Sequence, residues 1–164
     1  MKTAICPGSF DPITLGHLNV IRRASQIFDE VIVCVMHNMT KKSPMFTVEE
    51  KLAMVEKAVE RYGNVRVDWS DGLLAEYVRK YEHPVIVKGL RAASDFEYEF
   101  QMNLINKKIN PELETMFLTA SEKYTFLSSS VVREMAIYGA KLDGLVPTEL
   151  IPEIERKARE WRAK

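Results

Sequence analysis

The stretch GSFDPITLGH spans Gly8–His17, directly behind the short apolar run Thr3–Cys6. Its Gly and Pro residues are typical of a turn between a strand and a helix. A turn needs no histidine, and His17 falls where the opening turn of the next helix is expected. Helix N-termini carry unpaired backbone N–H groups that favour anions. We therefore expect a strand, a turn and a helix here, with a candidate anion site at their junction.

Apolar runs rich in β-formers alternate along the chain with segments whose apolar residues repeat at helical spacing. The runs predict strands at 3–6, 31–36, 65–69, 85–87 and 115–118. Helical spacing predicts helices around 21–28, 52–59, 74–78, 96–105, 129–138 and 147–162. This alternation predicts an α/β fold, a doubly wound parallel five-stranded sheet with helices on both faces. We expect one domain over residues 1–164, ending in a C-terminal helical segment.

Composition argues against several kinds of partner and setting. Lys plus Arg (23) equals Asp plus Glu (23), so no overall basic field would attract nucleic acid or a membrane, and we expect neither partner. No apolar stretch approaches the roughly 20 residues that span a bilayer, and the start lacks a signal-peptide pattern. Cys6 and Cys34 lie in apolar runs, which favours buried free thiols over a disulfide. These features predict a cytoplasmic protein.

Ligands of doubly wound sheets bind at the carboxyl ends of the strands, so the residues after each strand are the candidates. An isolated histidine is more often structural, and Thr14 could be only a helix cap. The Gly-x-His placement nevertheless favours function for His17, because an imidazole donor helps to hold a phosphate. Lys41 and Lys42 could belong to a solvated loop, but at this edge at least one is a candidate phosphate clamp.

Lys88 and Arg91 flank Gly89 after the fourth predicted strand. A surface ion pair is the usual role of such an arginine, whereas a lysine directly after a buried strand favours an anionic ligand. Leu74, after the third strand, fits an apolar helix face better than a site, although a backbone amide there could meet a ligand. The serines of 128–130 could cap a helix, with Ser129 or Ser130 as the expected cap, or surround a phosphate chain, with a structural or charge-balancing role for Arg133.

Together these connections predict a polyphosphate site. The sequence has no G-x-x-x-x-G-K-[ST] and no G-x-G-x-x-G after the first strand, and it shows no zinc-ligand spacing. Phosphoryl chemistry without an enzyme nucleophile therefore fits best.

Four motifs carry a resemblance that runs nearly end to end: 8–17, 41–47 with Lys41-Lys42 and Pro44-Met45-Phe46-Thr47, 89–99 with Gly89-Leu90-Arg91, and 128–133 with Ser128-Ser129-Ser130. By these motifs the chain resembles the bacterial phosphopantetheine adenylyltransferase family of the nucleotidyltransferase superfamily, with its H/T-x-G-H signature. The resemblance implies a Rossmann-like fold and adenylyl transfer from ATP, with Mg²⁺, to 4′-phosphopantetheine. It also implies a homohexamer and feedback inhibition by coenzyme A.

The resemblance further implies roles for individual residues. His17 and Lys41 would stabilise the transition state. The positions that match pantetheine-contacting residues are Ser9, Lys41, Leu74 and Lys88. The positions that match the ATP site are Ser9, Phe10, His17, Gly89, Leu90, Arg91, Glu99, Tyr124, Thr125, Phe126, Leu127, Ser128, Ser129 and Ser130. No residue is expected to be a dedicated metal ligand.

Three departures from the family pattern stand out: Lys88 replaces the more frequent Arg, Ser43 looks like an extra residue, and Ser9 replaces Thr. Two alternatives remain. One is a related enzyme that uses nicotinate mononucleotide or glycerol 3-phosphate, against which the segments 89–91 and 128–130 argue. The other is a nucleotide sensor without turnover, against which the retention of His17 and Lys41 argues.

Overall fold

The structure is a computed structural model that describes residues 1–40 and 43–164. In this part of the chain the strands are β1 (Thr3–Gly8), β2 (Glu30–Met36), β3 (Val65–Ser70), β4 (Val85–Leu90) and β5 (Glu114–Thr119). The α-helices are α1 (Leu15–Ile27), α2 (Val48–Val59), α3 (Leu74–Tyr77), α4 (Ala93–Ile109), α5 (Ser129–Ile137) and α6 (Ile151–Arg162). Short 3₁₀ turns are η1 (Val78–Lys80), η2 (Glu122–Tyr124) and η3 (Thr148–Leu150).

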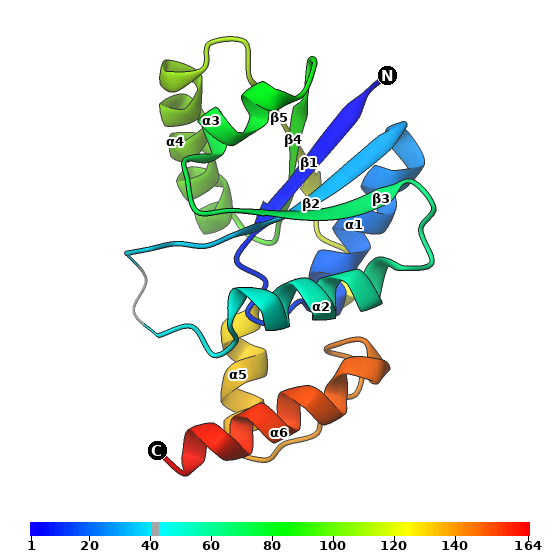
Figure 1. Cartoon of the computed structure of the whole chain (residues 1–164), viewed down its shortest axis with the longest axis vertical. Helices are drawn as coiled ribbons and strands as arrows, with labels where there is room; N and C mark the ends of the chain where they lie inside the picture. Colours follow the sequence, from blue (N-terminus) through cyan, green and yellow to red (C-terminus); the bar gives the residue numbers. More distant parts are fainter. Residues whose placement is uncertain (41–42) are drawn as a thin grey trace.

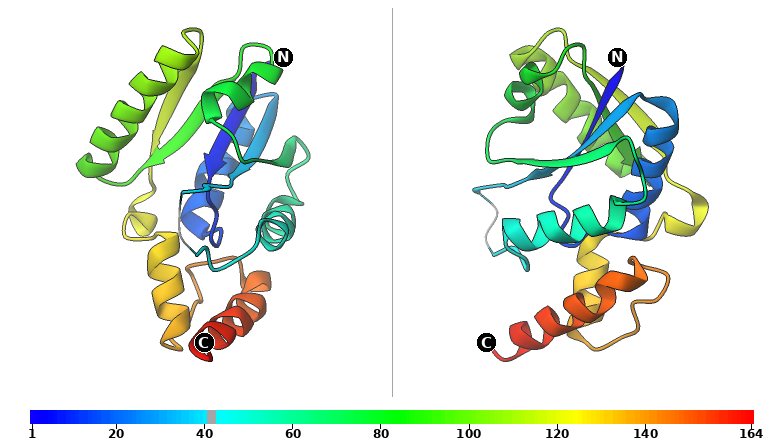
Figure 2. Two further views of the ribbon diagram at one scale, coloured as in Figure 1. Left: turned by 60° about the vertical axis from the view of Figure 1, so that its left-hand side comes forward. Right: turned by 45° about the vertical axis from the view of Figure 1, so that its right-hand side comes forward.

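The strands form one parallel sheet in the order β3-β2-β1-β4-β5 (Figure 1). Ala4 and Cys6 of β1 join the cluster that includes α1 and α2, whereas Ile5 joins the cluster beneath α3. This alternation follows from the two-residue period of a strand. With α4 on the same side as α3 (Figure 2), the predicted doubly wound sheet is confirmed.

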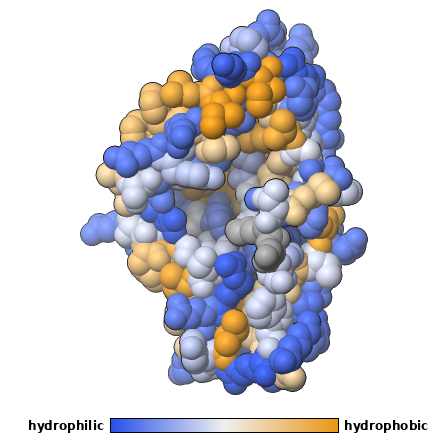
Figure 3. All heavy atoms as spheres, turned by 90° about the vertical axis from the view of Figure 1, so that its left-hand side faces the viewer, coloured by the Kyte–Doolittle hydropathy of each residue, from blue (hydrophilic) through white to orange (hydrophobic). Residues whose placement is uncertain are grey.

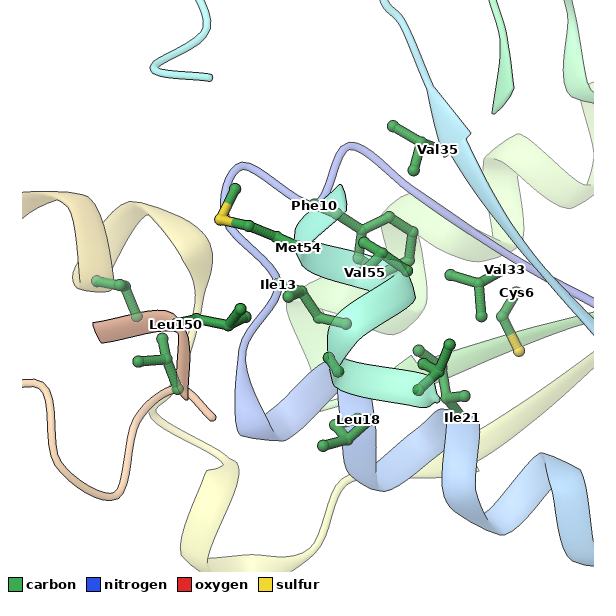
Figure 4. Packing of buried hydrophobic residues seen from close by; sticks show 14 of the residues in the cluster. Cys6, Phe10, Ile13, Leu18, Ile21, Val33, Val35, Met54, Val55 and Leu150 are labelled. Atoms are coloured by element: carbon green, nitrogen blue, oxygen red, sulfur yellow. The ribbon is translucent and has the colours of Figure 1, made fainter. Parts of the chain in front are cut away.

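The larger core continues past the carboxyl ends of the strands to the terminal helices. Ile13, fully buried ahead of α1, lies near Leu150 at the start of the terminal segment (Figure 4). Cys6 and Cys34 are buried free thiols, as predicted. Burial raises the pKa of the Cys6 thiol to about 12, which keeps it protonated. Among the described residues no helix has the length and apolar character needed to cross a membrane.

Several predicted boundaries were wrong. β4 runs to Leu90, so Lys88 and Gly89 lie within the strand and not after it. Neither residue is a β-former, but pairing with β5 extends the strand through both. The terminal α-helix begins only at Ile151, behind η3, with Pro152 in its first turn, where a missing N–H costs nothing.

Helix α4 differs most from an ordinary core helix. Its predicted helical repeat is confirmed, yet none of its residues is buried. Phe96, Phe100 and Leu104 are 46%, 47% and 54% exposed. A sequence repeat indicates that apolar residues share a face, but it does not indicate what covers that face.

Strands β1 and β4 are paired over only a short length. Their register contains only the pairs Ala4–Val85 and Ile5–Ile86, whereas β4 pairs with β5 along its whole length. Beyond Ile5 the chain reaches Pro7, which has no N–H to donate to a ladder. The two strands separate at the point where the strand order reverses, which is where doubly wound sheets bind ligands.

Candidate active site

A cavity of about 300 Å³ occupies this separation. Its floor consists of 6–8 from β1 and 87–89 from β4, and the start of α1 forms one wall. Residues of α4 and of the segment 124–129 complete it. Figure 3 shows the corresponding face of the molecule, hollowed below the apolar side chains of its upper part. The cavity therefore collects residues from distant parts of the sequence.

His17 is held in the first turn of α1 by a pair of reciprocal capping hydrogen bonds with Thr14. The Oγ1 of Thr14 accepts the backbone N–H of His17 at 3.3 Å, and the Thr14 backbone N–H donates to Nδ1 of His17 at 3.0 Å. This is a capping box with histidine in the place where Glu or Gln is usual. Because Nδ1 accepts this hydrogen bond and is therefore unprotonated, Nε2 carries the ring N–H of the neutral imidazole.

Burial, reinforced by the positive charge of Arg91, lowers the pKa of His17 from 6.5 to about 4. The imidazole is therefore neutral at physiological pH. The sequence predicted His17 as a donor that lies among cations. In the structure it is an uncharged N–H donor beside the positive charge of Arg91.

Two glycines allow close packing around His17. The ring of Phe10 meets the imidazole edge-on at 5.1 Å, and a Cβ on Gly8 would lie 3.0 Å from that phenyl ring. A Cβ on Gly89 would lie 2.7 Å from Cγ2 of Val20, on the first helix. Glycine at position 8 leaves room for the Phe10 ring, and glycine at position 89 allows β4 to lie close to α1.

Lys88 has a protein partner. Its Nζ donates to Oε2 of Glu99 at 2.6 Å, across the cavity wall from β4 to α4. The sequence favoured an anionic ligand for this lysine, which stays a prediction; in the structure the Glu99 carboxylate compensates its charge. One bond to Glu99 still leaves the ammonium group two further N–H donors.

Arg91 is held more rigidly. Its Nε and Nη2 donate to Asp95 at 2.9 and 3.2 Å, and Nη1 donates to the carbonyl oxygen of Leu127 at 3.0 Å. Asp95 also accepts the backbone N–H of Arg91 at 3.0 Å, and these bonds lower the pKa of its carboxyl group. The guanidinium is fixed in one orientation, with N–H groups to spare on its outer edge.

The serine segment caps a helix, which is one of the two roles that the sequence left open; contact with a phosphate chain stays a prediction. Ser128, and not Ser129 or Ser130, is the N-cap of α5, accepting the Val131 N–H at 3.2 Å. Ser129 donates its hydroxyl to the carbonyl of Pro12 at 2.7 Å. Ser128 and Ser129 line the cavity, so the N-terminus of α5 lies at it, and first-turn N–H groups without an acceptor in the helix suit an anion.

Buried Asp11 ties the site to two other elements. Its carboxylate accepts the backbone N–H groups of Met45 and Phe46 at 3.1 and 2.9 Å. Lys51 and Arg133 approach it at 3.9 and 3.5 Å, and Arg133 also donates to the Asp11 carbonyl. The charge-balancing role expected for Arg133 has its partner here.

The structure brings ten of the predicted site residues to one cavity wall: Phe10, His17, Lys88, Gly89, Arg91, Glu99, Tyr124, Leu127, Ser128 and Ser129. Ser9, Leu74, Leu90, Thr125, Phe126 and Ser130 are not part of that wall. Lys41, with Lys42, lies outside the described residues.

Sequence reasoning missed two contributors. Asp95 fixes Arg91, and the i, i+4 spacing of an acid and an arginine could have indicated it. The backbone N–H of Thr14 fixes the His17 tautomer, and a backbone group leaves no sequence signal.

The cavity wall suits a metal ion that arrives on a ligand. No three His, Cys, Asp or Glu side chains lie together as a metal site in the described part of the chain. The two wall carboxylates, Asp95 and Glu99, are each engaged by a cation. Mg²⁺ commonly keeps waters and binds through substrate phosphates, so the donors fit an ion carried by a nucleotide.

Comparison with known proteins agrees with this geometry. The cytidylyltransferase-like family model matches residues 5–135. A phosphopantetheine adenylyltransferase of Clostridium kluyveri is 52% identical over 157 residues, which are 96% of this chain and 95% of that protein. A protein of the same name from Clostridium botulinum strain Hall is 48% identical over the same shares. A crystal structure assigned as a nicotinate-nucleotide adenylyltransferase from Vibrio parahaemolyticus shares the fold, with a TM-score of 0.71 at 21% identity, over 98% of this chain and 97% of that one.

Proposed function

This chain belongs to the cytidylyltransferase-like family and, within it, to the phosphopantetheine adenylyltransferases, and we propose that its β1–β4 cavity is the site of adenylyl transfer. The reaction moves the adenylyl group of ATP to 4′-phosphopantetheine and gives dephospho-coenzyme A and pyrophosphate, a step of coenzyme A synthesis. One observation carries the assignment to the cavity: a neutral N–H donor, His17, shares a wall with the cations Lys88 and Arg91.

In the proposed step a phosphate oxygen of 4′-phosphopantetheine attacks the α-phosphorus of ATP in line. The new P–O bond forms as the bond to the bridging oxygen breaks, and its electron pair leaves with pyrophosphate. No general base is needed, because a phosphate dianion is already nucleophilic. His17 Nε2–H, Arg91 and Lys88 offset the charge that builds on the phosphoryl oxygens, so the enzyme contributes position and electrostatics.

The proposed roles of Lys41 and Mg²⁺ rest on the family resemblance. Lys41 would join His17 at the transition state and Lys88 at the acceptor phosphate, with Ser9 and Leu74 along the pantetheine arm. Mg²⁺ would be held by the triphosphate of ATP and would neutralise its charge when bound. The amide end of α5 and residues 124–130 would receive the nucleotide.

The exposed apolar face of α4 supports the proposal that the chain assembles with copies of itself. Phe96, Phe100 and Leu104 are joined there by Ile105 and by Met116 of β5, all more than a third exposed. Figure 3 shows apolar side chains gathered over the upper part of this side. Large exposed apolar patches mark interaction sites, and we assign this one to further copies of the chain, up to a hexamer.

Coenzyme A shares the pantetheine arm and diphosphate of the product, so it would compete for the same cavity as a feedback inhibitor. The test is competitive inhibition against 4′-phosphopantetheine in steady-state kinetics. Inhibition that a high acceptor concentration does not relieve would place coenzyme A elsewhere.

Pyrophosphate release tests the reaction itself. ATP and Mg²⁺ are supplied with 4′-phosphopantetheine, with nicotinate mononucleotide, or, as a third arm, CTP is supplied with glycerol 3-phosphate. We expect release with 4′-phosphopantetheine alone. Release with another acceptor would keep the chemistry and overturn the substrate, and ATP binding without any release would indicate a sensor.

A further inference from the structure

The ion pair between Lys88 and Glu99 lies at the place where the proposed acceptor phosphate must bind. Both side chains line the cavity and are about three-quarters buried, and their 2.6 Å bond bridges β4 and α4. With Arg91 and Asp95 they form two ion pairs side by side, so this part of the wall has no net charge. A phosphate that binds Lys88 therefore meets a carboxylate that already holds it.

The two pairs are not equivalent. Asp95, in the first turn of α4, holds Arg91, just ahead of that helix, through two side-chain bonds and one backbone bond. Glu99 holds Lys88 through one bond between two elements. A single bond to a flexible lysine is exchanged far more easily than a bidentate grip on a guanidinium. Of the two carboxylates, Glu99 is the one that a ligand can displace.

We propose that Glu99 is a displaceable counter-anion, which yields Lys88 to a doubly charged acceptor phosphate and reclaims it once the phosphate has been adenylylated. This inference rests on the proposed function and deepens it. It makes Glu99 a specificity-determining residue of the acceptor site, in addition to any contact with ATP.

The acceptor phosphate loses negative charge in the reaction, and this loss determines when it can compete with Glu99 for Lys88. A phosphomonoester carries nearly two negative charges at neutral pH, because its second pKa is near 6. After attack on the α-phosphorus, the same phosphate is one half of a diphosphate linkage and carries one. Lys88 thus faces a stronger competitor before the reaction than after it. Glu99 thereby disfavours weakly charged acceptors and favours departure of the product.

Isothermal titration without ATP separates this role from a nucleotide contact. We expect Glu99→Gln to bind 4′-phosphopantetheine about fivefold more tightly than the wild type, the factor that corresponds to removing a competing pair worth about 1 kcal/mol. Pantetheine, which lacks the phosphate, should bind both proteins equally. Glu97→Gln, an equal charge change at an exposed position of the same helix, should leave both affinities unchanged.

A double variant shows whether the effect passes through Lys88. If it does, Glu99→Gln changes phosphate affinity far less in a Lys88→Gln background. In steady state, dephospho-coenzyme A should inhibit Glu99→Gln at a lower concentration than it inhibits the wild type. An unchanged inhibition constant would overturn the role in product release.

Weaker binding of 4′-phosphopantetheine by Glu99→Gln would overturn the proposal, because Glu99 would then orient Lys88 for the phosphate. A full effect in the Lys88→Gln background, or an equal effect with pantetheine, would overturn it as well. If the wild type binds no 4′-phosphopantetheine, the proposed function fails along with it. Binding by the wild type without tightening in Glu99→Gln would refute this inference alone.

Discussion

The backbone N–H of Thr14 donates to Nδ1 of His17, and so the helix cap and the proposed catalytic donor are one structure. The cap decides which ring nitrogen carries the proton. Nε2–H can then donate to a phosphoryl oxygen without any prior proton transfer.

Replacing His17 by alanine removes this donor. We expect kcat to fall about a hundredfold, the size of losing one preorganised donor, with a smaller change in KM. Pyrophosphate release at saturating substrates measures the loss, and circular dichroism checks folding. A folded variant with near-normal kcat would remove His17 from the mechanism.

The lowered pKa of His17 predicts a pH dependence of stability. Its folded value, about 4, lies below the ordinary 6.5, so the unfolded chain binds the proton more readily between these values. The contribution to stability is therefore complete above pH 6.5 and is lost as pH falls toward 4. Between pH 6.5 and pH 4 the thermal unfolding temperature of the wild type should fall more than that of His17→Gln. Parallel curves would contradict the shift.

Asp11→Asn tests the buried contacts that Asp11 makes with Met45, Phe46 and Arg133. Asparagine offers one acceptor oxygen for two backbone donors and removes the negative charge that Lys51 and Arg133 approach. We expect a loss of about 3 kcal/mol in the free energy of unfolding, measured with urea. Asp143→Asn, an exposed control, should change it by less than about 0.5 kcal/mol. Equal losses would show that Asp11 has no special part.

Gly89→Ala tests the close approach of β4 to α1. The new methyl would lie 2.7 Å from Val20, and we expect a cost of about 1–3 kcal/mol together with reduced ATP affinity. Val20→Ala in the same chain should restore much of both. Gly63→Ala, where a Cβ meets nothing within 4 Å, is the control. A failure of Val20→Ala to rescue would place the strain elsewhere.

Phe100→Glu tests the outer face of α4. A charge in the middle of this apolar face should disperse the assembly, so light scattering should move from a multiple of 18.8 kDa toward that mass. Tyr138→Glu introduces the same charge at a residue that is 80% exposed and distant in the fold. The Tyr138 variant should keep the wild-type mass, and a monomeric wild type would refute the assignment.

Much of the fold could be predicted because strand and helix periods are local properties of the sequence. The five parallel strands followed from runs such as Val31–Met36, and the cap of α1 followed from the residue types in 8–17. The length of β4 could not be predicted, because pairing with β5 holds Lys88 and Gly89 in extended form despite their weak preference.

The candidate site divides in the same way. His17, Lys88 and Arg91 are chemically conspicuous, and their predicted positions at or beyond the ends of strands indicated a common edge, although Lys88 lies within β4. Their protein partners were hidden, because which carboxylate reaches Lys88 depends on how α4 crosses β4. The neutral state of His17 likewise depends on burial and on a neighbour 74 positions away, as the numbers 17 and 91 show.

The brief register between β1 and β4 also divides the molecule mechanically. Strands β1, β2 and β3 are continuously paired and form one half of the sheet, and β4 and β5 form the other. Two residue pairs between β1 and β4 join these halves. Toward the cavity the two halves are joined by side-chain packing, such as that of Val87 in the larger core, and not by a backbone ladder. Because residues of both β1 and β4 line the cavity, a nucleotide bound there as we propose would contact both halves and would connect them where the strands themselves do not.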